Sequence, residues 1–137
     1  MYFILIIIVL NFSCSSFNAF KINNNNKIIL KTQTMKNGEF CKEEWKNNFL
    51  HGTTTCWNKS NNIISKVNYL NGYLDGKWIQ FYDNGHVMYS IDYMLGKKSG
   101  FEIWYYEDSA IKSKAEYLNN QILSEIIRWD NSGNILE

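Results

Sequence analysis

Histidine is the side chain that most often acts as a general base near neutral pH, and the chain contains two, His51 and His86. Neither has the neighbours of a catalytic site, because no serine–histidine–aspartate or cysteine–histidine order surrounds them and no glycine run opens a helix that could hold phosphate. The equivalent positions of the following sequence repeat, described below, hold Asp75 and Ala110, and such variety is typical of exposed turns. We expect both histidines to be turn residues, the chain not to be an enzyme, and no cofactor to bind.

Cysteine offers two further kinds of chemistry, metal binding and disulfide formation. Cys41 and Cys56, even with His51 between them, match no closed zinc pattern and lack an evident fourth ligand, so we predict no metal site. A disulfide between Cys41 and Cys56 is one alternative, because they lie on either side of one predicted connection and would face each other if the first repeat were one residue shorter. Two buried thiols that pack as small apolar residues are the other alternative.

A fixed period organises most of the chain. Tyrosine recurs at Tyr69, Tyr93 and Tyr117, and the two intervals, 117 − 93 and 93 − 69, are both 24. Glycines recur with the same period in two series, which are Gly72 with Gly96, and Gly52 with Gly76 and Gly100. A fixed period indicates one small unit stacked on copies of itself.

Each unit has the pattern of two half-buried strands. From Val87 to Tyr93 every second side chain is apolar or aromatic and most of the others are polar, and residues 63–69 and 111–117 alternate in the same way. The preceding Asp83-Asn84-Gly85 favours a hairpin turn, because Asn and Gly tolerate positive φ. The sequence therefore predicts an all-β fold, an extended and twisted antiparallel meander of about four two-stranded repeats.

The repeated motifs resemble the bacterial variant of the MORN repeat. The similarity rests on Tyr69-Leu-Asn-Gly72, Gly76-Lys77-Trp78 and Tyr82-Asp-Asn-Gly85, followed by Tyr93-Met-Leu-Gly96 and Gly100, and it covers residues 45–137. The predicted repeat-turn glycines are Gly52, Gly72, Gly76, Gly85, Gly96 and Gly100. The departures, Asn48 in the first copy and Asn120 and Ser124 in the last, fall where repeats cap the stack.

The chain before the repeats divides into two segments. Residues 2–10 are all apolar, too few to span a bilayer, which needs ~20, and they predict an export signal within residues 1–20. Ser13-Cys14 resembles a lipoprotein signal with Cys14 as the lipidated residue, whereas cleavage near Ser16 and an uncleaved N-terminal anchor are the alternatives. Asn-rich residues 21–33 are predicted to be a tether, and residues 34–137 the repeat domain.

Charge argues against nucleic acid as a partner. The net charge is +1, from 14 Lys and Arg against 13 Asp and Glu, so the chain has no strong basic field. Arg128 is its only arginine, which removes the usual bidentate reader of phosphates and bases.

Four large aromatic side chains are the candidate binding residues: Trp78, Tyr82, Trp104 and Tyr106. Alternation assigns Phe81 and Ile103 to a shared apolar face and these four to the opposite face, which also carries polar side chains. Tryptophan and tyrosine often anchor protein interfaces, so the second face could bind a partner. Alternatively, both faces of a thin repeat sheet carry aromatics that are sheltered by turns and lysine stems.

These observations predict a non-catalytic MORN-like repeat module that is exported and associated with the membrane of the bacterial cell envelope, through its N-terminal segment or a lipid anchor. Its expected role is to bind an unidentified protein partner. The resemblance also implies an alternative, because some bacterial proteins with this repeat are labelled antitoxins. In that alternative the protein binds and neutralises a toxin.

Overall fold

The computed structural model describes residues 18–19, as backbone only, and residues 27–136. The predicted export signal with Cys14, apart from the backbone of residues 18–19, and residues 21–26 of the predicted tether therefore lie outside the described residues. In the described part of the chain, no helix is long and apolar enough to cross a membrane.

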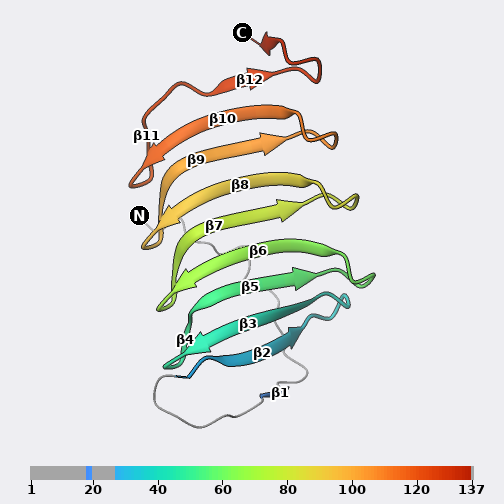
Figure 1. The fold of residues 1–137 in the computed structure, drawn as a ribbon, viewed down its shortest axis with the longest axis vertical. Coiled ribbons are helices and arrows are strands. Elements are labelled where there is room, and N and C mark those ends of the chain that lie inside the picture. Colours follow the sequence, from blue (N-terminus) through green and yellow to red (C-terminus); the bar gives the residue numbers. More distant parts are fainter. Residues whose placement is uncertain (1–17, 20–26, 137) are drawn as a thin grey trace.

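One antiparallel sheet of thirteen strands contains all the regular structure that is described (Figure 1). Its strands are β1 (Asn18–Ala19), β2 (Ile29–Thr34), β3 (Phe40–Lys46), β4 (Phe49–Leu50), β5 (Gly52–Trp57), β6 (Ile63–Leu70), β7 (Tyr73–Phe81), β8 (Val87–Met94), β9 (Lys97–Tyr105), β10 (Ile111–Leu118), β11 (Gln121–Ile122), β12 (Ile127–Trp129) and β13 (Ile135–Leu136). The strands follow one another across the sheet in sequence order, with β4 paired to β3 and β11 to β10. This topology confirms the predicted all-β meander.

Two kinds of turn alternate along the chain and form the two edges of the ladder of hairpins (Figure 1). At one edge, here called the short-turn edge, two-residue turns occupy residues 47–48, 71–72, 95–96 and 119–120, and both residues of each turn have positive φ. At the other, the long-turn edge, five-residue turns begin at Met35, Asn58, Tyr82, Tyr106 and Asp130, each closed by a backbone hydrogen bond from its first residue to the carbonyl of its fifth. Because turn type fixes strand register, the repeated turns impose the repeated pairing.

Backbone hydrogen bonds join each of the later short turns to the connection before it. The amide of Gly72 donates to the carbonyl of Leu50 at 2.8 Å, that of Gly96 to Leu74 at 2.7 Å, and that of Asn120 to Lys98 at 3.0 Å. Donor and acceptor have the same separation in sequence in all three pairs. The short-turn edge is thus held by main-chain contacts that do not depend on side-chain identity.

A one-residue bulge beside the long turns decides which side chains share a face. Phe81 pairs with Val87, but its neighbour Gln80 pairs with Tyr89, so β8 contains one extra residue. Corresponding shifts occur between β5 and β6 and between β9 and β10. With this shift, Trp78 lies directly across from Ile91. A one-residue slip moves every side chain of a strand to the other face. The bulge therefore inverts the faces that would be assigned to β8 by counting alternate residues from the turn.

The predicted division of side chains is confirmed, because Trp78 and Trp104 lie on the face opposite Ile103, but the prediction of which face is buried is wrong. The face that contains Ile91, here called the Ile91 face, also carries Trp78 and Trp104, because Trp78 pairs with Ile91 and Trp104 pairs with Tyr89. Ile103 pairs with Ser90 on the other side of the sheet, the Ile103 face. All the buried apolar residues belong to the Ile91 face by their pairing: Cys41, Val67, Leu74, Tyr89, Ile91 and Ala115.

Three of the predicted turn glycines lie within strands. Gly52, Gly76 and Gly100 belong to β5, β7 and β9, near the places where register shifts toward the short-turn edge. At Gly100, with φ of 126°, an added Cβ would come within 2.8 Å of the Asp92 Cβ. Glycine is needed at this position because β9 runs so close to the Asp92 side chain of the neighbouring strand β8 that a Cβ would not fit.

The sheet begins earlier than the predicted domain boundary. Strand β2 covers Ile29–Thr34, of which residues 29–33 lie within the predicted tether, and it pairs along its whole length with β3. This first hairpin has no bulge, because its register runs unbroken from Ile29 opposite Trp45 to Thr34 opposite Phe40. The first hairpin lacks the extra bulge residue of the later ones, and this explains the spacing of the long turns. The first two long turns, which begin at Met35 and Asn58, are one position closer in sequence than the later ones.

Cys41 and Cys56 lie directly across from each other on β3 and β5 and are joined by a disulfide. They are 15 residues apart. Ser65 and Gln80 have the same separation and are paired in the same way in the next repeat, which is not shortened. The pairing of the two cysteines therefore does not depend on the residue that the first hairpin lacks. Closing a loop of this length contributes ~3 kcal/mol in the chain-entropy model.

Ile91 is completely buried and is the best single test of the observed faces. We predict that Ile91→Ala lowers the free energy of unfolding by about 3 kcal/mol, because it removes apolar contacts and leaves a cavity. Ile127→Ala is the matched control, since Ile127 is 43% exposed and pairs with Lys114 on the Ile103 face, and its cost should stay below about 1 kcal/mol. Urea unfolding followed by circular dichroism measures both, and equal losses would contradict the assignment.

Candidate functional site

The two tryptophans among the candidate binding residues have different surroundings. Trp78 is half-buried, meets the Tyr89 ring edge-on at 6.0 Å, and donates its indole N–H to the Ser65 hydroxyl at 3.2 Å. Trp104 contacts the other side of Tyr89 at 4.5 Å between ring centroids but remains 41% exposed. Trp78 therefore packs within the sheet, whereas Trp104 offers surface to a ligand.

The two tyrosines among these candidates tie neighbouring hairpins together at the long-turn edge. Each is the first residue of a long turn, and each donates its hydroxyl to a carbonyl of the next hairpin. The acceptor is Tyr105 for Tyr82, at 2.7 Å, and Trp129 for Tyr106, at 2.8 Å. Their polar ends are thus occupied within the fold. The four candidate aromatics are not brought together into one binding patch.

A small hollow adjoins Trp104 on the Ile91 face. It has a volume of about 160 Å³ and is lined by Glu102, Trp104, Ser113, Ala115, Tyr117, Ile126 and Arg128. Glu102 accepts a hydrogen bond from the Tyr89 hydroxyl at 3.0 Å and pairs with the Lys98 ammonium at 3.2 Å. Such a hollow can take one side chain of a partner, with Trp104 as its wall.

The charged pair beneath this hollow replaces apolar residues of the preceding repeat. Lys98 stands where that repeat has Leu74, and Glu102 stands where it has Trp78. The Lys98 ammonium also lies over the Tyr117 ring, 4.9 Å from its centroid. The β9–β10 hairpin therefore has a polar cluster at a point where the β7–β8 hairpin has apolar contacts.

This cluster changes the ionisation of three tyrosines. Burial raises the pKa of Tyr89 far above its usual value, and the negative charge of Glu102 raises it further. Burial and the same carboxylate raise the pKa of Tyr93 and of Tyr117. All three tyrosines therefore resist deprotonation in the folded protein.

The structure separates the two histidines. His51 lies between β4 and β5, with its Nδ1 3.1 Å from the side-chain oxygen of Asn71. His86 closes a long turn and donates from Nδ1 to the carbonyl of Glu107 at 2.6 Å. Among the described residues, no group of three or more His, Cys, Asp or Glu side chains is placed to hold a metal ion. Each histidine instead contacts a neighbouring repeat.

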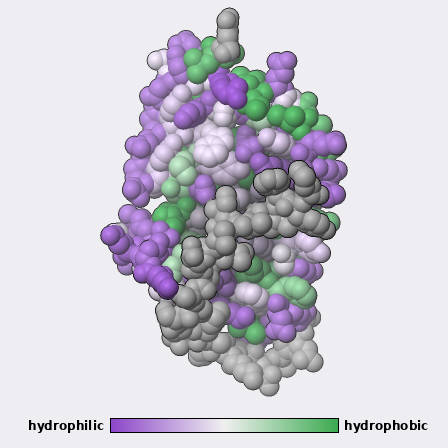
Figure 2. Space-filling model, turned by 180° about the vertical axis from the view of Figure 1, so that it is seen from behind, coloured by the Kyte–Doolittle hydropathy of each residue, from purple (hydrophilic) through white to green (hydrophobic). Residues whose placement is uncertain are grey.

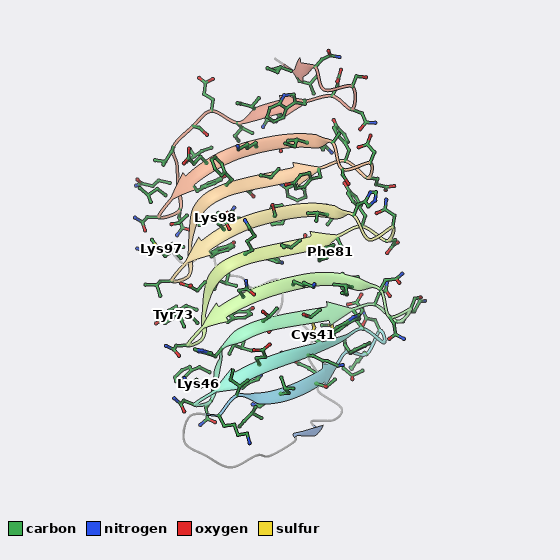
Figure 3. The ribbon with its side chains drawn as sticks, in the orientation of Figure 1. Cys41, Lys46, Tyr73, Phe81, Lys97 and Lys98 are labelled. Carbon is green, nitrogen blue, oxygen red and sulfur yellow. A yellow bond between two sulfur atoms is a disulfide. The ribbon has the colours of Figure 1, made fainter. Side chains whose placement is uncertain are left out.

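An exposed apolar strip along the short-turn edge was missed by the sequence analysis. Its members flank or occupy the two-residue turns and are between 38% and 60% exposed: Phe49, Leu70, Tyr73, Met94, Leu95 and Leu118. Figure 3 shows Tyr73 at this edge, with Lys46 and Lys97 near it and Phe81 toward the opposite edge. We call these six residues the short-turn strip.

Leu95 is the member of the strip that the repeat pattern could have revealed. The first residue of the other short turns is Asn47, Asn71 or Asn119, and all four positions have positive φ. Asparagine tolerates this left-handed conformation, whereas leucine is strained in it. Leu95, with φ of 47°, is thus an unfavourable residue for its turn and is also 60% exposed.

The MORN repeat variant is the family whose model matches the chain, at residues 50–71 and 74–94. The two matches coincide with the β5–β6 and β7–β8 hairpins. Two hairpins of the chain are therefore similar to the MORN repeat variant. No curated protein matches the chain. The same hairpin recurs beyond the matched units, as β9–β10 and in shorter form as β12–β13.

Tyrosine ionisation gives a pH test of the polar cluster. Because the folded pKa values of Tyr89, Tyr93 and Tyr117 lie above the ordinary 10.0, the folded protein keeps protons that the unfolded chain releases. The stability that results is complete below about pH 10 and is lost as pH rises beyond it. We predict a falling urea midpoint above about pH 10, and a shallower fall in Glu102→Gln, which removes the carboxylate charge. Equal slopes in the two proteins would contradict the role of Glu102.

Proposed function

We propose that this protein is a non-catalytic MORN-repeat module that binds a protein partner through its short-turn strip. The repeat family supports the general role of an interaction module. The strip supports its placement, because contiguous exposed apolar side chains mark interaction surfaces more often than scattered ones do. Trp104 and its hollow form a second, smaller surface on the Ile91 face.

Leu95 is the observation that carries this proposal. A left-handed leucine raises the free energy of the folded state by about 1 kcal/mol, and the equivalent asparagines show that the same turn forms without this strain. The leucine also leaves most of its apolar side chain in water. Backbone strain and an exposed apolar side chain both make leucine unfavourable at this position. Contact with a partner that buries the side chain would explain why leucine is present.

The remaining contacts of the strip make it a firm platform. Phe49 packs against the next short turn, since an added Cβ on Gly72 would lie 3.2 Å from its ring. The amide of Leu95 donates to the Asp75 carboxylate at 3.0 Å, which holds one turn against its neighbour. A pre-organised apolar surface loses little conformational freedom on binding, and this favours affinity.

We extend the proposal to the location of the protein, which is exported and held at a membrane through its N-terminal segment. The apolar run before Cys14 supports this, as does the Cys41–Cys56 disulfide, since disulfides persist mainly in oxidising compartments. Intact mass measured on protein from its native host should show a lipid on Cys14. A chain that begins after Ser16, or an unmodified Met1, would rule out the lipid anchor.

An antitoxin role is a narrower form of the same proposal, because a toxin is one kind of protein partner. It adds one requirement, that binding inhibits the partner's activity. The decisive measurement is therefore an activity assay of the captured partner with and without this protein. Unchanged partner activity at saturating binding would leave the general interaction module and remove the antitoxin.

Leu95→Asn is predicted to affect stability and binding in opposite directions. It should raise the free energy of unfolding by about 1 kcal/mol by relieving the strained turn, and weaken partner binding about tenfold by removing an apolar contact. The partner is first captured from native extract on immobilised protein and identified by mass spectrometry. Its affinity for each variant is then measured by titration with the purified partner.

Two controls separate the short-turn strip from other surfaces. Ile135→Asn changes a 68% exposed aliphatic residue at the end of the sheet and should leave binding unchanged. Trp104→Ala tests the second surface. If Trp104→Ala abolishes binding while Leu95→Asn leaves it unchanged, the partner docks on the Ile91 face and the placement proposed here is wrong.

A further inference from the structure

The long turns differ in a side chain that ties neighbouring repeats together. Asn58 occupies the turn position that Tyr82 and Tyr106 hold in the next two turns. Its shorter side chain accepts hydrogen bonds within its own turn, from the amides of Ser60 at 2.9 Å and Asn62 at 3.0 Å. In the described part of the chain, turn 58–62 therefore lacks the tyrosine tie to the next hairpin that turns 82–86 and 106–110 possess.

Two hollows lie beside this untied turn. One of about 350 Å³ lies between it and turn 82–86, with Phe81 in its lining, and one of about 550 Å³ lies between it and turn 35–39. Both volumes fall within the range of small-molecule sites, about 300–1,000 Å³. The hollows share Asn62 and Asp83, so they adjoin each other along three successive turns, and we call the two together the cleft. Hydrophilic residues project from this long-turn edge, at the left in Figure 2.

The cleft presents hydrogen-bond donors and acceptors in balance. Asn37 and Asn58 use their side-chain oxygens within their own turns, and this leaves their amide N–H groups as donors. Glu39 and Asp83 contribute carboxylate acceptors. Lys59 and Lys66 match these two negative charges, so the lining has no net charge.

We propose that this cleft binds a neutral carbohydrate of one or a few sugar rings. A sugar hydroxyl donates and accepts at once, and it needs amide donors and carboxylate acceptors within reach of each other. The apolar C–H face of a sugar ring packs on aromatic surface, which Phe81 provides beside Ile63. The inference is separate from the protein-binding strip, which lies at the opposite edge of the sheet.

The lining fits other ligand classes less well. A phosphate polymer or acidic glycan needs net positive charge, which is missing here. An extended peptide binds by adding a strand to an unpaired sheet edge, whereas β5, β6, β7 and β8 are each paired on both sides. A neutral ligand rich in hydroxyl groups remains the class that the cleft matches.

The repeat supplies its own variant for a test. Asn58→Tyr with Ser60→Asn copies the Tyr82 and Asn84 positions of the next turn, so it should add the missing tie and fill the cleft. The matched control is Asp130→Tyr with Ser132→Asn, which makes the same changes at the corresponding positions of the last turn. The probe is a glycan array that carries neutral, acidic and sulfated oligosaccharides, with a peptide array beside it.

We expect the full-length protein and the control variant to bind the same neutral glycans, and the Asn58→Tyr/Ser60→Asn variant to bind them about tenfold more weakly or not at all. Its thermal midpoint should be no lower than that of the wild type. If this variant fails to fold, Asp83→Ala, which removes an exposed acceptor common to both hollows, should produce the same loss. Binding to acidic glycans alone, binding to peptides alone, no binding, or undiminished binding by the folded cleft variants would overturn the proposal.

Discussion

The fold depends on one constraint, that successive two-residue turns place their second amide against a carbonyl just after the preceding turn. A single-layered sheet has no second sheet to fix its register, so the register must come from turns and from contacts between successive hairpins. Both residues of each short turn adopt positive φ, which matches the twist of the flanking strands. Because the hydrogen bond involves only backbone atoms, side chains at this edge are free to vary, and Leu95 shows how far they do.

The sequence predicts the period, the strands and the meander, because alternation and turn composition are local properties. It does not predict which face is buried, because this depends on one extra residue in β8 and on the corresponding bulges in the hairpins to either side. Nothing in the types of Val87 and Met88 marks that bulge. The same limit applies at the N-terminal end, where β2 pairs with β3 although its residues looked like part of a tether.

The candidate site was only partly predictable for a related reason. Alternation identified Trp104 as a large aromatic that its strand does not bury, and the structure leaves it 41% exposed. Tyr82 and Tyr106 were grouped with it because residue type does not reveal that their hydroxyls are occupied. Their acceptors lie in the next hairpin, one position short of the period, so a comparison of equivalent positions does not pair them.

Departures from the repeat locate function better here than residue type does. In a stack of similar hairpins, the common residue at a position is the one that the fold favours, so an interior exception needs a reason of its own. Leu95 replaces a favourable asparagine and exposes apolar surface at the short-turn edge. Asn58 replaces a tyrosine tie and opens a polar cleft at the long-turn edge. The two exceptions have opposite chemistry and lie at opposite edges, which favours two different ligands that this sheet could hold at the same time.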